Sequence, residues 1–115
     1  MPIGDYSYLT IVPKGAELIT LSGHVGVDRE GYIPDSVEEQ FQISLENIVS
    51  LHKSENLDTN GIIKINIWLT EKEDKDVFVD IYKKFHKDFP PAMTLAYVMA
   101  LGTPYLKVEV LAARF

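Results

Sequence analysis

Apolar residues at helical spacing mark two segments of the chain. In the first, they recur every three or four residues along one face, at Val37, Phe41, Leu45 and Ile48. The preceding Ser36-Val37-Glu38-Glu39 is a capping-box pattern, in which serine and glutamate side chains satisfy free amides of the first turn. Together these features predict a helix that begins near Ser36 and ends near Ser54.

A second helix is predicted from about Asp74 to His86. Its apolar stripe is formed by Val77, Ile81 and Phe85, and Phe78 and Tyr82 widen that stripe. Phe89-Pro90-Pro91 ends this helix, because proline cannot continue the hydrogen-bond ladder.

Alternating patterns predict strands. Residues 62–70 have one apolar face, Ile63, Ile65, Ile67 and Leu69, and one mixed face, Lys64, Asn66, Trp68 and Thr70. The last strand, 105–113, places Leu106, Val108, Val110 and Ala112 opposite Lys107, Glu109 and Leu111. Residues 94–101 are apolar on both faces, which favours a strand at the centre of a sheet or one covered by a second subunit.

The N-terminal part is expected to form a hairpin. A strand over residues 16–22 follows the turn Pro13-Lys14-Gly15, and a strand near 6–12 is expected to pair with it. The predicted order β-β-α-β-α-β-β is typical of an α+β sandwich with both helices on one face of a mixed sheet. A chain of 115 residues has the size of one domain, so residues 1–115 are predicted to form a single domain.

The sheet face away from the helices carries Trp68 and Leu111 among Lys64, Asn66, Lys107 and Glu109. Large exposed apolar surfaces usually mark interfaces. The pattern therefore predicts a homo-oligomer that buries this face.

Composition and charge narrow the class of protein. Hydrophobic residues make up 46% of the chain, enough to form a core. No apolar run approaches the ~20 residues of a membrane helix, and the first residues show no secretory signal. With no cysteine, the chain fits a reducing compartment, so we expect a cytoplasmic protein without membrane contacts. The net charge of −6 argues against a nucleic-acid partner.

Cofactor motifs are not found in the sequence. The chain has no cysteine, its three histidines are scattered, and no glycine-rich phosphate motif occurs. We therefore expect neither a metal nor a cofactor.

Several short motifs follow one another in a fixed order: Ile3-Gly4-x-Tyr6, Ser22-Gly23, Glu39-Gln40 with Leu45-x-Asn47-Ile48, Phe89-Pro90-Pro91-Ala92 and Val108-Glu109-Val110. With this order and spacing, nearly the whole chain resembles the Rid family (reactive intermediate deaminases, also called YjgF-like or L-PSP proteins). The resemblance implies a chorismate-mutase-like fold and a homotrimer with ligand clefts between subunits. It also implies hydrolysis of enamines and imines to 2-oxo acids and ammonia, without cofactor or metal.

Three positions depart from the family pattern. The deaminases have an arginine after the Pro-Ala pair, where this chain has Met93, and often a cysteine two residues later, where it has Leu95. Their acid on the last strand matches Leu111, while Glu109 matches the preceding acid. Losing a bidentate arginine contact to a carboxylate costs ~2–5 kcal/mol. Efficient 2-aminoacrylate deamination is therefore not expected, unless Arg29 of a neighbouring subunit substitutes.

The resemblance places Tyr6, Ser22, Gly23 and Phe89 at the cleft, together with Met93, Leu95 and Leu111. His24 stands where the family often has glutamine. Because histidine can act as a general base, His24 is a candidate catalytic residue, as is Glu109, although His24 could also be an ordinary loop residue.

Three functions remain open at this level. The first is a small-molecule binding protein of the Rid type. The second is an enzyme that hydrolyses another imine, enamine or amide-like substrate, with polarity from Tyr6, Ser22, His24 and either Glu109 or bound water. The third is RNA cleavage, attributed to some L-PSP relatives, against which the acidic charge argues.

Overall fold

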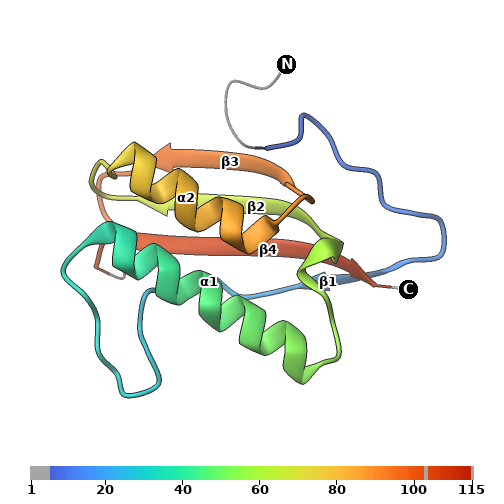
Figure 1. Ribbon diagram of the computed structural model, residues 1–115, viewed down its shortest axis with the longest axis horizontal. Coiled ribbons are helices and arrows are strands. Elements are labelled where there is room, and N and C mark those ends of the chain that lie inside the picture. The colour runs from blue at the N-terminus through green and yellow to red at the C-terminus, as the bar shows by residue number, and fades with distance from the viewer. Residues whose placement is uncertain (1–5, 103, 115) are drawn as a thin grey trace.

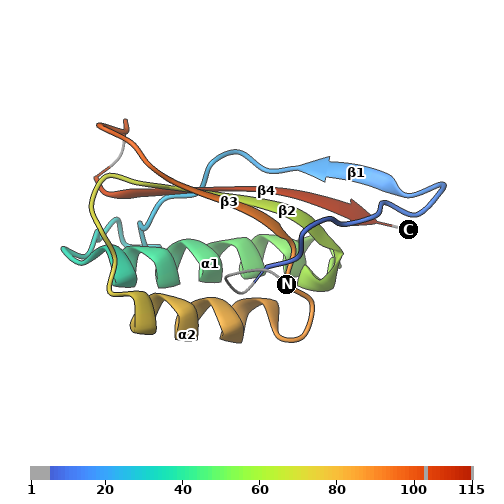
Figure 2. The same cartoon turned by 90° about the horizontal axis from the view of Figure 1, so that it is seen from above.

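Two helices cover one face of a mixed four-stranded sheet (Figures 1 and 2). The computed structural model describes residues 6–102 and 104–114; Ile3, Gly4, Thr103 and the side chain of Arg114 lie outside this description. The strand order is β1-β4-β2-β3, with β2 and β3 parallel and the other neighbours antiparallel. The predicted α+β fold class is confirmed. The elements are β1 (Glu17–Thr20), α1 (Val37–Ser54), the short 3-10 helix η1 (Thr59–Gly61), β2 (Ile62–Leu69), α2 (Lys75–His86), β3 (Ala92–Tyr97) and β4 (Leu106–Arg114).

Both helices begin at a capping side chain, and that of α1 is the predicted Ser36. The Ser36 side chain accepts a hydrogen bond from the Glu39 amide at 3.1 Å, and the Asp74 side chain accepts from the amides of Asp76 and Val77. The Asp74 amide in turn donates to the Glu38 carboxylate at 2.9 Å. This last contact ties the start of α2 to the first turn of α1.

The buried face of α2 is rotated relative to the predicted stripe. Val77 was expected on that stripe, but it is 45% exposed. Phe85 is buried as predicted, Phe78 and Tyr82 are buried although they were expected only to widen the stripe, and His86 is buried as well. The Phe78 ring stacks on the Phe41 ring of α1 with their centroids 3.8 Å apart. This aromatic contact with α1 accounts for the rotation, since it draws Phe78 rather than Val77 into the core.

The core lies between the helices and the inward faces of β2 and β4. The predicted inward residues of β4, from Leu106 to Ala112, are all buried. In β2, a register shift occurs between Ile62 and Lys64, so that Ile62 is buried while Ile63 is only half-buried. The placement of Ile63 on the buried face was therefore wrong, because the extra residue of a β-bulge reverses the alternation before it.

The predicted N-terminal hairpin is wrong. Residues 8–12 form no strand, and Ser7 instead makes an isolated parallel bridge to Ala92, at the edge of the sheet opposite β1. The Ser7 amide donates to the Pro91 carbonyl at 3.1 Å, and the Thr10 hydroxyl donates to the Ile63 carbonyl at 2.6 Å. These contacts hold the N-terminal segment beside β2 and β3, so β1 pairs with β4 alone.

The strand predicted over residues 94–101 is shorter and starts earlier, as β3. It lies at the edge of the sheet rather than at its centre, and Met99 beyond it is fully exposed. Met93 and Leu95 pack on the helix-side core, whereas Thr94 is exposed on the other face. A central position is therefore wrong for this strand, and its cover by a second subunit stays a prediction.

Candidate functional site

The segment after β1 stays attached to β4. The amide of His24 donates to the Val108 carbonyl at 2.7 Å, and the Val108 amide donates back to the His24 carbonyl at 2.8 Å. Gly23 lies directly against the Lys107 side chain, which would collide with any Cβ at this position. A side chain at position 23 would therefore displace the flexible Lys107 side chain, whereas the main chain of His24 is fixed in both directions.

The loop that follows His24 is anchored on α1 by two amide side chains. Gln40 is fully buried; its Nε2 donates to the Pro34 carbonyl at 2.8 Å, and its Oε1 accepts from the Tyr105 amide at 3.3 Å. Asn47 Nδ2 donates to the Val27 carbonyl at 2.9 Å. The Gln40 and Asn47 of the sequence motif therefore have a structural role, which is to hold the chain that frames His24.

A cavity of about 420 Å³ opens between the β1 segment and the last turns of α1. We call it the His24 cavity. Its polar lining comes from Thr20, Ser22, His24, His52 and Glu55, and its apolar walls are Ile19, Leu21, Leu51 and Leu57. A mostly apolar hollow of this size with a few convergent polar groups is typical of small-molecule sites.

His24 is half-buried at this cavity. Burial, and then the neighbouring imidazole of His52, lower the pKa of His24 from its usual value of 6.5. The uncharged form is therefore favoured at neutral pH, and an uncharged imidazole has a lone pair that can accept a proton.

His52 is a site residue that the sequence analysis missed. A histidine in the last turn of a helix suits an exposed cation, yet His52 is only 2% exposed. The missed signal is its spacing, since His52 continues the apolar stripe of Leu45 and Ile48 at intervals of seven and four residues. A histidine on the buried face of a helix needs polar partners or a functional reason.

Glu109 and Leu111 lie on the opposite face of the sheet from the His24 cavity. Glu109 accepts a hydrogen bond from the Trp68 indole at 3.0 Å, and on the same face Lys64 donates to the Thr94 hydroxyl at 2.8 Å. These side chains are half-buried or exposed, and no other part of the described chain forms a layer over them (Figure 2). Within one chain, Glu109 and His24 therefore do not share a site.

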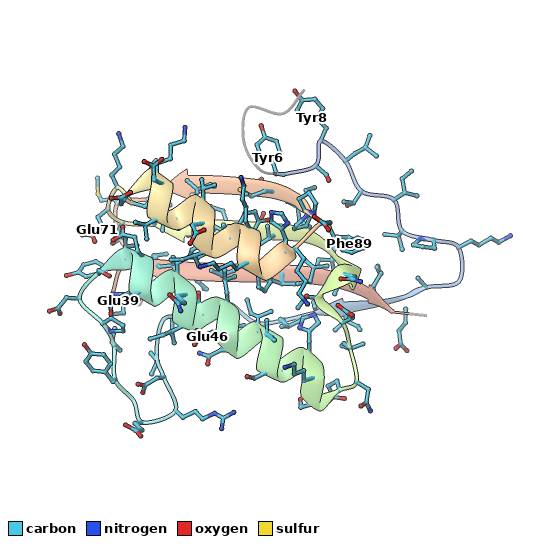
Figure 3. All side chains as sticks on the ribbon, viewed as in Figure 1. Tyr6, Tyr8, Glu39, Glu46, Glu71 and Phe89 are labelled. Carbon is cyan, nitrogen blue, oxygen red and sulfur yellow. The ribbon has the colours of Figure 1, made fainter. Side chains whose placement is uncertain are left out.

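The other predicted cleft residues are dispersed. Met93 and Leu95 pack against the core from β3, and neither lines the His24 cavity. Tyr6 lies on the N-terminal segment with its ring 6.3 Å from that of Tyr8, and Phe89, which is 54% exposed, follows α2 (Figure 3). Arg29 is exposed in the loop before α1. One chain thus brings together Ser22 and His24, and the grouping of the remaining residues stays a prediction.

A larger hollow of about 600 Å³ lies between α1 and α2 on the outer surface of the helical layer. Its floor is apolar, including Val49, Val77 and Ile81, and its rim carries the exposed ion pair Asp80–Lys84 at 3.1 Å. Exposed ion pairs of this kind contribute little energy. The hollow brings no buried polar side chain toward a ligand, so the His24 cavity is the stronger candidate site.

The described residues offer neither a metal-binding cluster nor a membrane-spanning helix. Over residues 6–102 and 104–114, no group of three histidine, aspartate or glutamate side chains has an arrangement that could hold a metal ion. None of the helices in the same ranges is both long and apolar enough to cross a membrane.

The fold and the motif order together define an α+β protein of the L-PSP class, and comparison with known proteins agrees. The family model described as Endoribonuclease L-PSP matches residues 1–113. The chain therefore belongs to the endoribonuclease L-PSP family, which includes the Rid proteins, and the resemblance drawn from its motifs is confirmed.

Several known proteins are similar to this chain in sequence. The chain is 34% identical over 88 residues to a RutC family protein of Buchnera aphidicola, a match that covers 76% of the chain and, at 66%, just under two thirds of that protein. It is 30% identical over 112 residues to TdcF of Escherichia coli K12, named as a reactive intermediate deaminase, covering 93% and 86% of the two chains. It is 30% identical over 101 residues to 2-iminobutanoate/2-iminopropanoate deaminase of Mus musculus, covering 86% and 73%.

A solved structure supports the fold assignment. The crystal structure of E. coli TdcF with bound serine superposes with a TM-score of 0.77 at 28% identity, covering 99% of this chain and 91% of that one.

Proposed function

We propose that this protein is a Rid-type homotrimer that binds a small metabolite in clefts between its subunits and is a poor catalyst of 2-aminoacrylate hydrolysis. Two features of the chain support this proposal. One is the sheet face left uncovered within the chain, and the other is the apolar character of the positions where deaminases bind the substrate carboxylate.

The uncovered face supports assembly. The Trp68 ring and the Leu111 side chain lie there beside the hydrogen-bonded Trp68–Glu109 and Lys64–Thr94 pairs. A mixed face of this kind suits an interface, since it combines apolar area with pairs that are already satisfied. The number three comes from the resemblance to Rid proteins.

A single substitution tests the role of this face. Leu111→Asp places an unpaired carboxylate at the proposed interface, so we expect the mass measured by light scattering to fall from that of a trimer toward the 13.0 kDa of one chain. Val77→Asp adds the same charge to the exposed helical surface and should leave the mass unchanged. A wild-type protein that already runs as a monomer would contradict the proposal.

The apolar substitutions support weak deamination, and Met93 is the observation on which this part rests. A thioether has no hydrogen-bond donor and no charge, so it cannot hold a carboxylate as a guanidinium does. Met93 and Leu95 both pack against the core, and neither would offer such a contact from there. The deaminase names of the relatives point to the opposite expectation, so a direct assay is decisive.

That assay supplies 2-aminoacrylate from serine by a pyridoxal-phosphate-dependent lyase and follows the release of the 2-oxo acid. We expect release no faster with the purified protein than without it. A TdcF sample at the same concentration provides the reference. Acceleration as large as that given by TdcF would refute the interpretation of Met93.

The His24 cavity favours a second candidate, hydrolysis of an imine with a larger apolar side chain. In this scheme the substrate is the protonated imine, and the neutral His24 imidazole accepts a proton from water as the water oxygen bonds to the imine carbon and the C=N π electrons move to nitrogen. The protonated imidazole then gives its proton to the amino nitrogen of this adduct. The C–N bond breaks, the electrons of the adduct's O–H bond form the C=O bond as solvent water takes the hydroxyl proton, and ammonia and a carbonyl compound leave. Imines made from leucine by an amino-acid oxidase test this scheme, with accelerated ammonia release as the expected result and an unchanged rate as the contrary one.

A further inference from the structure

The polar lining of the His24 cavity is rich in hydrogen-bond acceptors. The Glu55 carboxylate can only accept, and the hydroxyls of Thr20 and Ser22 can accept as well as donate. Among the described residues, no lysine or arginine side chain lines this cavity. A ligand seated there therefore meets a negative charge and finds no fixed cation to pair with an anionic group.

His52 adds a buried acceptor to this lining. Its Nδ1 lies 2.9 Å from the Ile48 carbonyl oxygen, and a carbonyl oxygen can only accept, so Nδ1 carries the hydrogen. Nε2 of the neutral ring then has a lone pair, and this buried atom has no hydrogen-bond partner in the part of the chain that the structure describes. A buried acceptor without a donor costs free energy, which a donor supplied by a ligand recovers.

The end of α1 brings the two strongest acceptors to one side of the cavity. Glu55 follows His52 by three positions, and its amide donates to the His52 carbonyl at 3.1 Å. Side chains at this spacing are neighbours at the end of a helix. The peptide dipoles of an 18-residue helix also leave a partial negative charge at its C-terminus, which favours a cation there. Lys53, in the same turn, is exposed and lines a different hollow.

The apolar part of the lining is aliphatic. Ile19 and Leu21 come from β1 and the residue after it, whereas Leu51 and Leu57 come from α1 and the chain that follows it. Quaternary ammonium groups are recognised by aromatic rings, and none lines this cavity in the described chain. Aliphatic walls beside hydrogen-bond acceptors instead suit an alkyl chain that ends in a group with several N–H donors.

We propose that the His24 cavity binds a primary alkylamine in its protonated form, with the ammonium group donating hydrogen bonds to Nε2 of His52 and to the Glu55 carboxylate. A primary ammonium is charged at neutral pH, as a lysine side chain is, and it has three donors and no acceptor. All lining residues come from one chain, so the inference does not rest on the proposed clefts between subunits. Because it concerns binding alone, it does not rest on imine hydrolysis either.

Three ligands with the same carbon skeleton test the charge preference of the cavity. They are isopentylamine, isopentanol and isovalerate, which differ only in the head group. In calorimetric titrations of the full-length protein at neutral pH, we expect the amine to bind, the alcohol to bind more weakly and the carboxylate not to bind. Absence of amine binding would overturn the inference, and so would a carboxylate that binds as tightly as the amine.

The His52 nitrogens report the proposed contact directly by NMR of the wild-type protein. On addition of isopentylamine, the Nε2 resonance should move toward that of a hydrogen-bonded nitrogen. The Nδ1 resonance should change much less, because its hydrogen is already bonded to the Ile48 carbonyl. Amine binding that leaves Nε2 unchanged would show that the ligand lies elsewhere and would overturn the inference.

Substitutions separate the two acceptors. His52→Leu removes Nε2 and should weaken amine binding by about 10–100-fold, as expected for a hydrogen bond to a charged group. Glu55→Gln acts at an exposed carboxylate and should weaken binding by only about 2–5-fold. Since the Nε2 resonance is measured in the wild type, the test holds even if His52→Leu does not fold.

Glu39→Gln is the matched control for Glu55→Gln, because it removes the same charge from the exposed first turn of α1. Amine binding should be as in the wild type. A loss equal to that of Glu55→Gln would overturn the inference, since the overall negative charge of the chain would then explain amine binding. Amine binding at His52 without ammonia release from the leucine-derived imine would uphold the inference and refute the enzymatic candidate.

Discussion

Gln40→Ala is expected to lower the free energy of unfolding by about 2–4 kcal/mol. The side chain bonds the Pro34 carbonyl and the Tyr105 amide, and it is fully buried. Its removal leaves the buried carbonyl of Pro34 without a partner and frees the start of β4 from α1. Chemical denaturation of the wild type and the variant, followed by circular dichroism, measures the difference.

Gln42→Ala is the matched control, since it makes the same change two residues away on the same helix. The Gln42 side chain is exposed, and its one bond is to Glu46 at 3.1 Å. Such surface changes usually alter stability by no more than about 0.5 kcal/mol. Equal losses for the two variants would show that the contacts of Gln40 do not hold the loop before α1.

His24→Gln is expected to lower the rate of any imine hydrolysis by about 10²–10⁴-fold, the usual contribution of a general base. Glutamine can hydrogen bond but cannot take up a proton near neutral pH, so it preserves polarity in the cavity while removing the base. Initial rates for the leucine-derived imine at saturating protein measure the effect. Substrate binding should change much less than the rate.

Chemical rescue distinguishes a base from a structural side chain. His24→Gly leaves space at the cavity, and imidazole added to the buffer should restore part of the lost rate. The restored rate should follow the fraction of added imidazole that is uncharged. If His24→Gln retains the wild-type rate, His24 is not the base and the cavity has another use.

The helices and central strands could be predicted because their signals are local. The Ser36 cap and the apolar stripe behind it determine where α1 begins and which face it buries. The apolar spacing of α2 wrongly placed Val77 in the core. Phe78 is buried there by stacking on Phe41, and this stacking depends on how the two helices cross. A pattern within one helix contains no information about that crossing.

Pairing and register could not be predicted in the same way. Ile62 and Ile63 are chemically alike, so the sequence does not show which of them faces inward, and the bulge decides it. Residues 6–12 are likewise compatible with either a hairpin strand beside β1 or an extended segment along the opposite edge of the sheet. The contacts of Ser7 with β3 and of Thr10 with β2 select the opposite edge.

The candidate site was predictable only in part. Ser22 and His24 were named from the motif, and they do line a common cavity. His52 is 28 positions after His24, so only the folded chain shows that both line the same cavity. Its spacing on the α1 stripe would have marked it as buried, though not as a neighbour of His24.

The walls of the His24 cavity differ from the rest of the interior in one respect. Leu51 is exposed and Leu57 half-buried, and both lie outside the set of fully buried side chains. Exchanges of size or polarity at these two positions can therefore be tolerated by the fold while the shape of the hollow changes. Homologous proteins could therefore differ in the ligands they bind through substitutions at the positions of Leu51 and Leu57, while the fold is unchanged.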